Sequence, residues 1–489
     1  MNNRVGTGSM DKGSMFGFIP RAVVIPLVLI AVGALVTTRT AAIGDGIILV
    51  GFVWTTAISL VWALPIYVLF SPFTAGLLFH GHHVAISDAM AFSMAVALLI
   101  RHGPERVQGW VRTFFPRPFR WPVLLLLAIA VISLAHAQSH STALVKILEL
   151  VEFFVIIVAV AADFEGDGRA WIPTLVGLFA VAVYEALIGL EQFLLGIGPS
   201  SFQAFVGHIR AFGSFGQPNV FGAFMADTLP IVLALYLFGP KGRHRPWLLV
   251  VSILLALGVW ASLSRGAWVA DVAAIGLMGI FVWITRGRES MARYAGYAVI
   301  LPLVLFAVVT ALGHIDMSHT ALARHLQGKS AVSRAVSIFG SSVDTAQRFY
   351  IWKAALHAIR SHPVTGVGMG EFYIWVRSHM PAGLAYPPPH AHDIYLELGA
   401  DTGVVGIIAI LWLQVRWILT SVRLVLGRVG ALTDMQFALS LGAVGTFTAF
   451  IVQNWVDYMV DHGVIVPLLL MMGFVASLAI RPRVQRTDG

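Results

Sequence analysis

Residues 217–238 read QPNVFGAFMADTLPIVLALYLF, and this stretch decides the fold class of the chain. Asp227 is its only charged residue, and about 20 predominantly apolar residues are enough for an α-helix to cross a membrane. The apolar residues are continuous and do not alternate with polar ones, which argues against a barrel strand. Because backbone polar groups in lipid must be hydrogen-bonded internally, we expect residues 217–238 to form a membrane-spanning helix.

Similar apolar stretches recur along all 489 residues, of which 58% are hydrophobic and only 11% charged. Soluble proteins have about 25% charged residues, so this chain lacks the charge to cover a soluble surface. The sequence predicts an all-α, polytopic bundle of about 12 to 14 transmembrane helices, the count staying open because residues 44–79 are long enough to hide a second crossing. We expect spans near residues 21–38, 46–70, 84–101, 121–137, 143–163, 171–196, 217–238, 245–262, 266–286, 295–314, 403–424, 434–456 and 463–480.

The basic residues indicate how the bundle is oriented. The net charge is +8, but Lys and Arg form short clusters between apolar stretches, as the positive-inside rule describes. This distribution favours a membrane protein over a nucleic-acid partner. The clusters near residues 101–120, 241–245, 286–293, 423–428 and 481–486 fall on one side, which we take as cytoplasmic. The position of the amino terminus stays open, because the span count places it outside and its own basic residues favour the inside.

The chain divides into four regions, and its lack of cysteine excludes disulfides, thiolate metal sites and cysteine nucleophiles. The third region is a large, mostly helical, extracytoplasmic loop. The regions are the N-terminal transmembrane helices (1–170), central transmembrane helices with arginines on outward loops (171–314), the large loop (315–402), and C-terminal transmembrane helices with a cytoplasmic tail (403–489).

The loop 315–402 holds seven of the 17 histidines and several Lys and Arg residues. Long loops are translocated regardless of charge, so these residues fit either a small folded ectodomain or a site for an anionic substrate. Residues 345–359 carry apolar side chains at helical spacing, with Phe349, Trp352, Leu356 and Ile359 as the predicted apolar face. The glycine-rich segment 362–370 fits a close-packed turn better than a phosphate cradle, because it lacks the P-loop pattern.

Ionisable residues also occur where we expect membrane or its boundary, and such residues usually mark a functional interior. Lys146 and Glu149 share a helix face and can neutralise each other. Arg210 and Arg265 lie at the outward ends of helices, where they either extend toward water or converge on one anion. His390 and His392 precede a predicted helix and fit a general base or a metal site, although no recognised zinc spacing is present.

Taken together, these residues resemble the O-antigen ligase family. The pair His392-Asp393, nine residues, and Gly403-Val404-Val405-Gly406 are similar to a signature in which His is followed by Asn, Ser or Gln, nine residues and G-x-x-G. The segments 362–368, 210–219 and 264–266 are also similar to that family, and the resemblance extends over residues 180–460. Asp393 departs from the signature, and this departure favours the related polymerases over the ligases.

The resemblance implies an enzyme of the bacterial inner membrane whose active site faces the periplasm. Its reaction would be a metal-independent, inverting glycosyl transfer without a cofactor. The donor would be a glycan on undecaprenyl pyrophosphate. We expect an O-antigen ligase with lipid A–core as acceptor; the alternatives are a polysaccharide polymerase that extends another glycan and a transferase to a protein hydroxyl.

The residues suggest roles in that reaction. Fixed guanidinium groups can stabilise a departing pyrophosphate, and a histidine near neutral pKa can accept the proton of an acceptor hydroxyl. Asp393 or Glu397 would orient this base, Tyr395 and Trp375 would stack on sugars, and Asn219 lies in a supporting motif. The candidates are His392 and, as its alternative, His390 for catalysis, and Arg265, Arg210 and Arg348 for the pyrophosphate.

Two other classes of protein remain as rivals. A secondary transporter would use the membrane-depth Lys, Glu and Asp residues for ion coupling, but the sequence shows no inverted repeat and no pair of broken helices. A non-catalytic assembly factor of a glycan pathway is the second rival. Both predict that substitution of His392 or Arg265 leaves glycan transfer intact.

Overall fold

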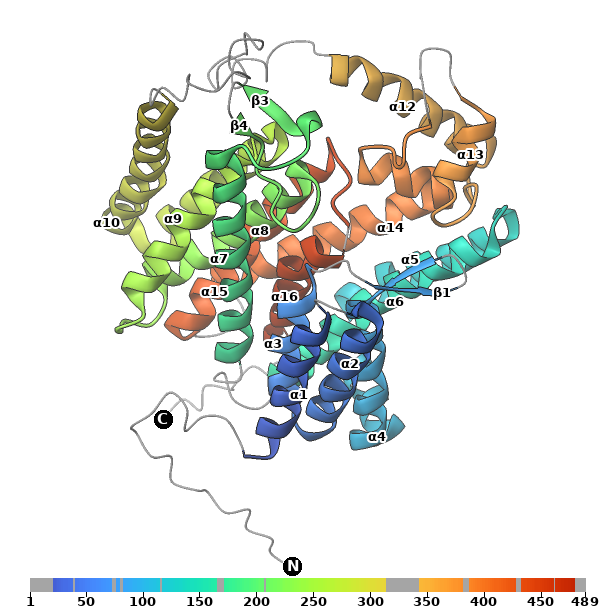
Figure 1. Cartoon of the computed structure of the whole chain (residues 1–489), viewed down its shortest axis with the longest axis horizontal. Helices are drawn as coiled ribbons and strands as arrows, with labels where there is room; N and C mark the ends of the chain where they lie inside the picture. The colour runs from blue at the N-terminus through green and yellow to red at the C-terminus, as the bar shows by residue number, and fades with distance from the viewer. Residues whose placement is uncertain are drawn as a thin grey trace, which may run out of the picture.

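The computed structural model confirms an all-α, polytopic membrane bundle (Figure 1). Among the described residues, six helices are long and apolar enough to cross a membrane, and shorter apolar helices accompany them. The structure describes residues 21–37, 40–72, 76–79, 82–114, 117–164, 171–205, 208–313, 343–380, 387–427, 432–460 and 462–479. Several expected features of the large loop, including His319, His325, Lys329 and Tyr386, lie outside these residues.

The N-terminal region consists of helices and one small hairpin. Ser59, whose backbone is extended, interrupts the predicted span 46–70 and separates α2 from α3. Serine is more favourable at helix boundaries than in helix interiors. The elements are α1 (Arg21–Thr37), α2 (Ala41–Ile58), α3 (Leu60–Phe70), β1 (Gly76–Phe79), β2 (His82–Ala85), α4 (Ile86–Phe114), α5 (Arg117–Ser133) with the short 3-10 helix Leu134–His136, and α6 (His140–Phe164).

The remaining elements surround α8, which lies at the centre of the bundle in Figure 1. In the most apolar stretch of α8, 89% of the residues are buried, against 72% for α15. These elements are α7 (Trp171–Leu195), the 3-10 helix Ser200–Phe202, β3 (Gln203–Phe205), β4 (His208–Ile209), α8 (Pro218–Phe238), α9 (Arg245–Ala261), α10 (Arg265–Gly313), α12 (Val343–Ser361), α13 (Phe372–Ser378), α14 (Ile394–Val425), α15 (Asp434–Asn454) and α16 (His462–Ala479).

Two of the long helices are interrupted at glycines. Gly287 in α10 has φ 75° and ψ −174°, and Gly403 in α14 has φ 73° and ψ −174°. Glycine adopts such backbone angles without the steric cost that other residues meet. The first interruption lies between the expected spans 266–286 and 295–314. The second lies at the start of the expected span 403–424, and the helical residues 394–402 before it form the helix predicted to follow the histidines.

The expected helix at 345–359 is present as α12, and two residues of its predicted apolar face point away from the rest of the protein. Phe349 is 55% exposed and Leu356 is 40% exposed. The buried face consists of Ile351, Ala354, Ala355 and Ala358, which pack with residues of α13 and α14. Small side chains let helices approach closely, so the alanines, and not the large apolar residues, mark the packed face of α12.

Candidate functional site

Asp457 is the centre of a polar cluster in the segment between α15 and α16. Its side chain is 8% exposed. Oδ1 lies 2.8 Å from Nδ1 of His392, and Oδ2 accepts a hydrogen bond from Asn219 Nδ2 at 2.8 Å. Nη2 of Arg348 also lies 3.4 Å from Oδ2, and the Arg348 guanidinium donates to the carbonyl of Val456. One carboxylate therefore joins three residues that the sequence had singled out separately.

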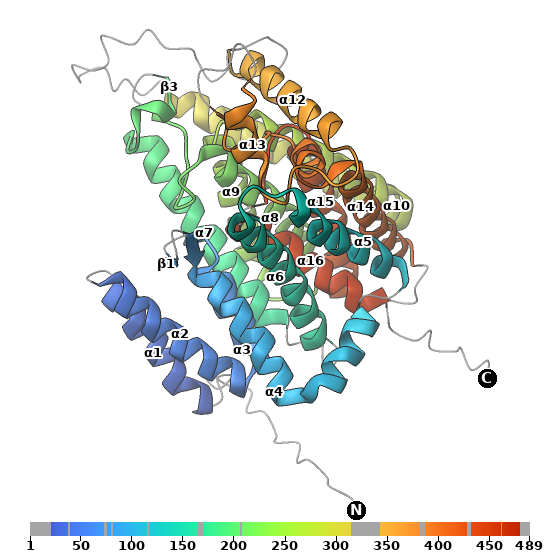
Figure 2. The ribbon, with the colours of Figure 1, turned by 90° about the vertical axis from the view of Figure 1, so that its right-hand side faces the viewer.

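Arg210 extends this cluster through Asn219. Arg210 Nη2 donates to Asn219 Oδ1 at 2.6 Å, and Arg210 Nε donates to the Ser262 carbonyl at 3.0 Å. The second bond connects Arg210 to the turn that leads into Arg265. The cluster thus draws on the segment before α8, the first turn of α8, α12, the segment before α14 and the segment after α15. Figure 2 shows α12 at the end of the bundle where β3 lies.

Two polar residues of α7 form hydrogen bonds with the segment that follows Arg210. Glu185 accepts from the backbone N–H and the hydroxyl of Ser214, at 2.8 and 2.5 Å. Gln192 accepts from the backbone N–H groups of Phe212 and Gly213, at 3.0 and 2.8 Å. These bonds satisfy two polar side chains that would be costly to bury alone. Glu185, a buried ionisable residue of α7, therefore positions the loop.

Arg265 is the first residue of α10, and its surroundings place it near the same cluster. A Cβ atom added to the next residue, Gly266, would lie 3.4 Å from a side-chain carbon of Val456, the neighbour of Asp457. Gly222 of α8 permits the close approach of the Ser262–Ser264 turn, since a Cβ there would lie 2.7 Å from Ser262 Oγ. The amino-terminal end of α10 adds partial positive charge to that of the Arg265 guanidinium.

His392 is held in an unusual backbone conformation. Its φ is 52°, and Leu263, just before Ser264 and Arg265, has φ 48°. These are the two non-glycine residues with positive φ among the described residues, and both lie at this site. Non-glycine residues rarely adopt such backbone angles unless the surrounding structure imposes them. Backbone strain of this kind is concentrated at functional sites. No described residue forms a hydrogen bond with His392 Nε2.

The two predicted supporting acids act on the backbone around His392. Asp393 is the N-cap of α14, and its Oδ1 accepts from the backbone N–H groups of Tyr395 and Leu396 at 2.8 and 2.9 Å. Glu397 accepts from the backbone N–H of Ala391, between the two histidines. The carboxylate that contacts the His392 ring is therefore that of Asp457 and not that of Asp393. Asp393 and Glu397 fix the segment that presents the ring.

The glycine-rich segment 362–370 forms a turn packed against the interruption of α14. The backbone N–H of Gly368 donates to the carbonyl of Asp401, and the Asp401 carboxylate accepts from the N–H groups of Gly370 and Phe372. A Cβ at Gly366 would lie 2.2 Å from the backbone of Asp401, and one at Gly403 would lie 2.5 Å from that of Val364. The segment is a close-packed turn, as expected, and Gly403, the first glycine of G-x-x-G, belongs to the same backbone contact.

The predicted sugar-stacking residues are largely covered by protein. Tyr395 is 5% exposed; its ring lies 4.8 Å from that of Trp455, and its hydroxyl donates to Gln414 at 2.9 Å. Trp375 is 5% exposed and stacks on His379 with 4.2 Å between ring centroids. Both rings stabilise the walls around the site in this conformation. Neither face is open for a sugar.

The electrostatics of the cluster differ between its members. Burial alone would raise the pKa of Asp457, but the hydrogen bond from His392 and the charge of Arg348 lower it to about 2. Burial lowers the pKa of His390 to about 4, with help from the nearby His392. Asp457 is therefore an anion and His390 is neutral near pH 7. Because a carboxylate only accepts, His392 Nδ1 carries a hydrogen and Nε2 of the neutral ring is left as an acceptor.

His390, His392 and Asp457 have ligand atoms within 4.8 Å of one another, which is close enough for a metal ion. The charge around them disfavours a cation. The Arg348 guanidinium lies 3.4 Å from the Asp457 carboxylate. Asn219 donates to the same carboxylate and itself accepts a hydrogen bond from Arg210. The same surroundings favour an anion beside the histidines.

Sequence reasoning missed Asp457. Arginine and histidine motifs identified the other residues of the cluster, whereas Asp457 lies in a short outward segment without a motif. Its position in the sequence was an available signal. Asp457 directly follows a predicted span, at the end of the bundle where the histidines are expected. An acid there is a candidate partner for a basic residue on the same side of the membrane.

An apolar cavity lies beside the cluster, between α5, α6, α14, α15 and α16. Tyr458, which follows Asp457 and stacks on His390 with ring centroids 5.5 Å apart, lines it together with Glu397. Lys146 and Glu149 also line it and form the expected ion pair at 2.7 Å. The rest of the wall is mostly aliphatic and aromatic. The cavity thus combines a polar border near the histidines with an interior suited to hydrocarbon.

Comparison with known proteins supports the resemblance seen in the sequence. Residues 250–411 match the family model described as O-antigen ligase. The match runs from α9 into α14 and includes Arg265, Arg348, His390 and His392, whereas Asp457 lies beyond it. A search of curated proteins returns no match. The family supports a glycosyltransferase of the ligase or polymerase type, with lipid-linked glycan and acceptor substrates in general. Over residues 250–411, this multi-pass membrane protein is therefore similar to the O-antigen ligase family.

Proposed function

We propose that the protein transfers a glycan from undecaprenyl pyrophosphate to an acceptor hydroxyl at the periplasmic face of the bacterial inner membrane. The observation that carries this proposal is the hydrogen bond between His392 and Asp457 at the end of the bundle where Arg210, Arg265 and Arg348 gather. A histidine oriented by a carboxylate can act as a base for an acceptor hydroxyl that attacks a sugar. The nearby arginines can bind the pyrophosphate that leaves.

In the proposed reaction, His392 Nε2 accepts the proton of the acceptor hydroxyl as its oxygen bonds to the anomeric carbon. The bond between that carbon and the pyrophosphate oxygen breaks, and its electron pair leaves with the lipid pyrophosphate. Attack opposite the leaving group inverts the configuration. Asp457 stabilises the imidazolium that forms on His392 and fixes the tautomer with Nε2 free.

The arginines supply the stabilisation of the leaving group without a metal ion. Guanidinium groups bind phosphate oxygens through two parallel hydrogen bonds, and their charge offsets the charge that develops on the pyrophosphate. Arg210 and Arg348 are held by Asn219, Ser262 and Asp457, so little reorganisation is needed when the donor binds. Arg265 contributes from the first turn of α10.

The apolar cavity beside Tyr458 suits the polyprenyl chain of the donor. Its walls are formed by membrane helices, and its polar border adjoins His390 through Tyr458. Burial of each methylene group stabilises binding by about 0.8 kcal/mol. A lipid held there would place its pyrophosphate near the arginines, which favours a lipid-linked donor over a soluble nucleotide sugar.

The test is reconstitution of the full chain with a lipid-linked glycan and separate acceptors. A one-step shift of lipid A–core would identify a ligase, which is our primary expectation, and a ladder of repeats would identify a polymerase. The variants H392A and R265A should each abolish transfer while the protein accumulates in the membrane as before. R243A, a substitution of an exposed arginine between α8 and α9, is the matched control. Full activity in both site variants contradicts the proposed function and revives the transporter and assembly-factor alternatives.

A further inference from the structure

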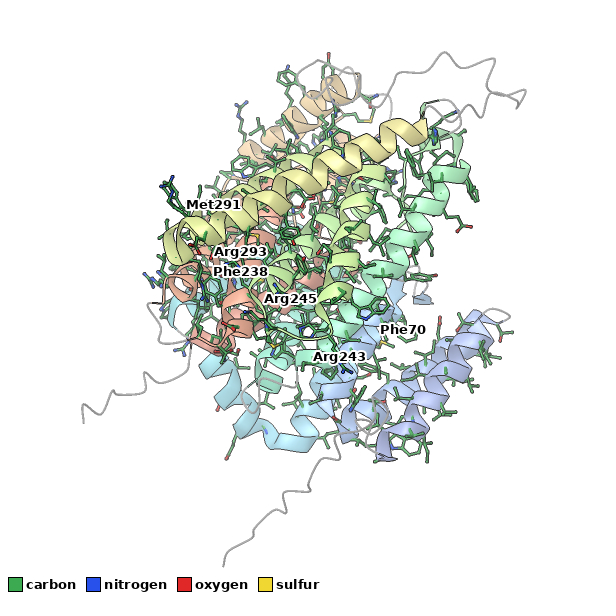
Figure 3. All side chains as sticks on the ribbon, turned by 90° about the vertical axis from the view of Figure 1, so that its left-hand side faces the viewer. Phe70, Phe238, Arg243, Arg245, Met291 and Arg293 are labelled. Atoms are coloured by element: carbon green, nitrogen blue, oxygen red, sulfur yellow. The ribbon has the colours of Figure 1, made fainter. Side chains whose placement is uncertain are left out.

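A second cavity, which is polar, lies at the opposite end of the helices that build the candidate site. On the side of the candidate site, α8 begins at Pro218, next to Asn219, and α15 ends at Asn454, shortly before Asp457. Their other ends, at Phe238 and Asp434, line this cavity. A helix as long as α8 spans about 30 Å, so the cavity is separated from the histidine cluster by the thickness of a membrane. Figure 3 shows Phe238, Arg245 and Arg293 at this end of the bundle.

The cavity is strongly basic. Lys241, Arg245, Arg286 and Arg293 line it, and Asp434 is the one carboxylate among its lining residues. None of the four cations forms an ion pair with any described residue. Cations on the cytoplasmic side follow from the positive-inside rule, but the rule does not require four of them, from the α8–α9 connection with the start of α9 and from α10, to surround one cavity.

Local contacts orient these cations without neutralising them. Arg245 Nε and Nη2 donate to the carbonyl of Tyr236 at 3.0 and 2.7 Å, which closes the end of α8. Arg286 lies over the ring of Phe437 with 4.1 Å to its centroid. Arg293 is 3.5 Å from Ser290 Oγ. Carbonyl and aromatic contacts leave the positive charge uncompensated by any anion, so the cavity is prepared for an anionic group.

Hydroxyl groups and tryptophans indicate what kind of anion fits. Tyr236 donates to the hydroxyl of Tyr297 at 2.9 Å, which leaves the Tyr297 hydrogen free for an acceptor. Trp247, two residues after Arg245, is 72% exposed, and Trp283, three residues before Arg286, is 61% exposed. Exposed tryptophans are typical of the level of lipid headgroups. The cavity therefore lies where membrane phospholipids present their phosphates.

We propose that this cavity binds the phosphodiester headgroup of an anionic phospholipid of the cytoplasmic leaflet. Basic pockets between transmembrane helices on that side suit such headgroups, and guanidinium groups match phosphate oxygens. The tryptophans favour a lipid over a soluble phosphate, because exposed tryptophans near the headgroup level suit contact with a lipid and add nothing to the binding of a soluble phosphate. The site is separate from glycan transfer and does not depend on the proposed reaction.

The experiment measures retention of phosphatidylglycerol by the full chain, by native mass spectrometry after exchange into nanodiscs that contain phosphatidylglycerol or only phosphatidylcholine. We expect selective retention of phosphatidylglycerol. The double variant K241Q/R293Q should weaken it by roughly tenfold or more, since each cation near a membrane surface contributes about 1 kcal/mol. The control R288Q changes an exposed arginine that does not line the cavity and should retain lipid as the parent does.

A second variant guards against a loss that comes only from misfolding. D434N removes the single carboxylate of the lining and should strengthen retention by a few-fold. Inorganic phosphate and ATP, offered separately at millimolar concentration, should not displace the lipid. Equal retention by the parent and K241Q/R293Q, weaker retention by D434N, or displacement by either soluble phosphate would overturn the proposed lipid site.

Discussion

Nδ1 of His392 and Oδ1 of Asp457 lie 2.8 Å apart although 65 positions separate them in the chain. The two residues approach because α14 and α15 pack against each other. The start of α14, after His392, lies at the same end of the bundle as the end of α15, before Asp457. His392 reaches Asp457 from a segment fixed by the Asp393 cap and by Glu397. The pair therefore depends on the fold of the C-terminal helices and not on any local sequence pattern.

The first prediction concerns the charge of Asp457. D457N keeps the size of the side chain, but its amide can donate to His392 and so favour the wrong tautomer of the ring. We expect transfer to fall by about 10² to 10⁴-fold with protein levels unchanged, by analogy with the loss of an orienting carboxylate in other His-based catalysts. Initial rates with a lipid-linked donor measure this.

The matched control is D393N, which retains the cap oxygen that accepts from Tyr395 and Leu396. It should reduce the rate far less than D457N. If the two substitutions cost the same, Asp457 does not orient the base, and the cluster has a structural role.

The second prediction concerns chelation. His390, His392 and Asp457 are close enough to hold a metal ion, yet Arg348 lies 3.4 Å from the same carboxylate. Because a guanidinium repels a cation at this distance, we expect EDTA to leave the transfer rate unchanged. A loss of activity that added Zn²⁺ restores would show that the three residues are metal ligands.

The sequence was sufficient for the helical bundle and for most residues of the cluster, because each had a local signal. Long apolar stretches predict spans, and Arg210, Asn219, Arg265 and His392 lie in motifs at the outward ends of those spans. Asp457 could not be paired with His392, since the pairing arises only when α14 and α15 pack. The buried face of α12 was missed for a related reason, because alanines such as Ala355 and Ala358 are buried by close helix contact and not by their own hydrophobicity.

The third prediction uses the pKa of His390, which burial lowers from 6.5 to about 4. The unfolded chain gains this proton as the pH falls below about 6.5, whereas the folded chain gains it only near pH 4, so folding loses stability between these values. The loss from His390 is on the order of 3 kcal/mol. Thermal unfolding in detergent should show the parent losing stability over this range more steeply than H390Q.

Asp457 also loses its contribution to stability as the pH falls, but in a lower pH range, and this difference separates the two effects. Its folded pKa of about 2 lies below its usual value of 3.8, so its contribution to stability is present above pH 4 and is lost as the pH falls toward 2. D457N should therefore change the pH dependence of unfolding only below about pH 4. An unchanged slope between pH 6.5 and 4 in H390Q would contradict the assignment of a buried, neutral His390.

The last prediction tests the close backbone contact of Gly366, a glycine of the segment 362–368. Gly366 has φ +67°, and an added Cβ would lie 2.2 to 2.3 Å from the backbone of Asp401 and Thr402. Since neither backbone can move without breaking the turn that binds Gly370 and Phe372, G366A should destabilise the protein by several kcal/mol, on the order of 3. G276A, in the interior of α10 where a Cβ meets nothing within 4 Å, should instead raise stability slightly, because alanine is the better helix former.

Thermal unfolding of both variants measures the difference in stability. The transfer rate should fall in G366A alone, because the turn that contains Gly366 packs against α14, which follows His392. Similar melting temperatures for the two alanine variants would mean that the turn at 362–370 tolerates side chains and does not fix the histidine segment.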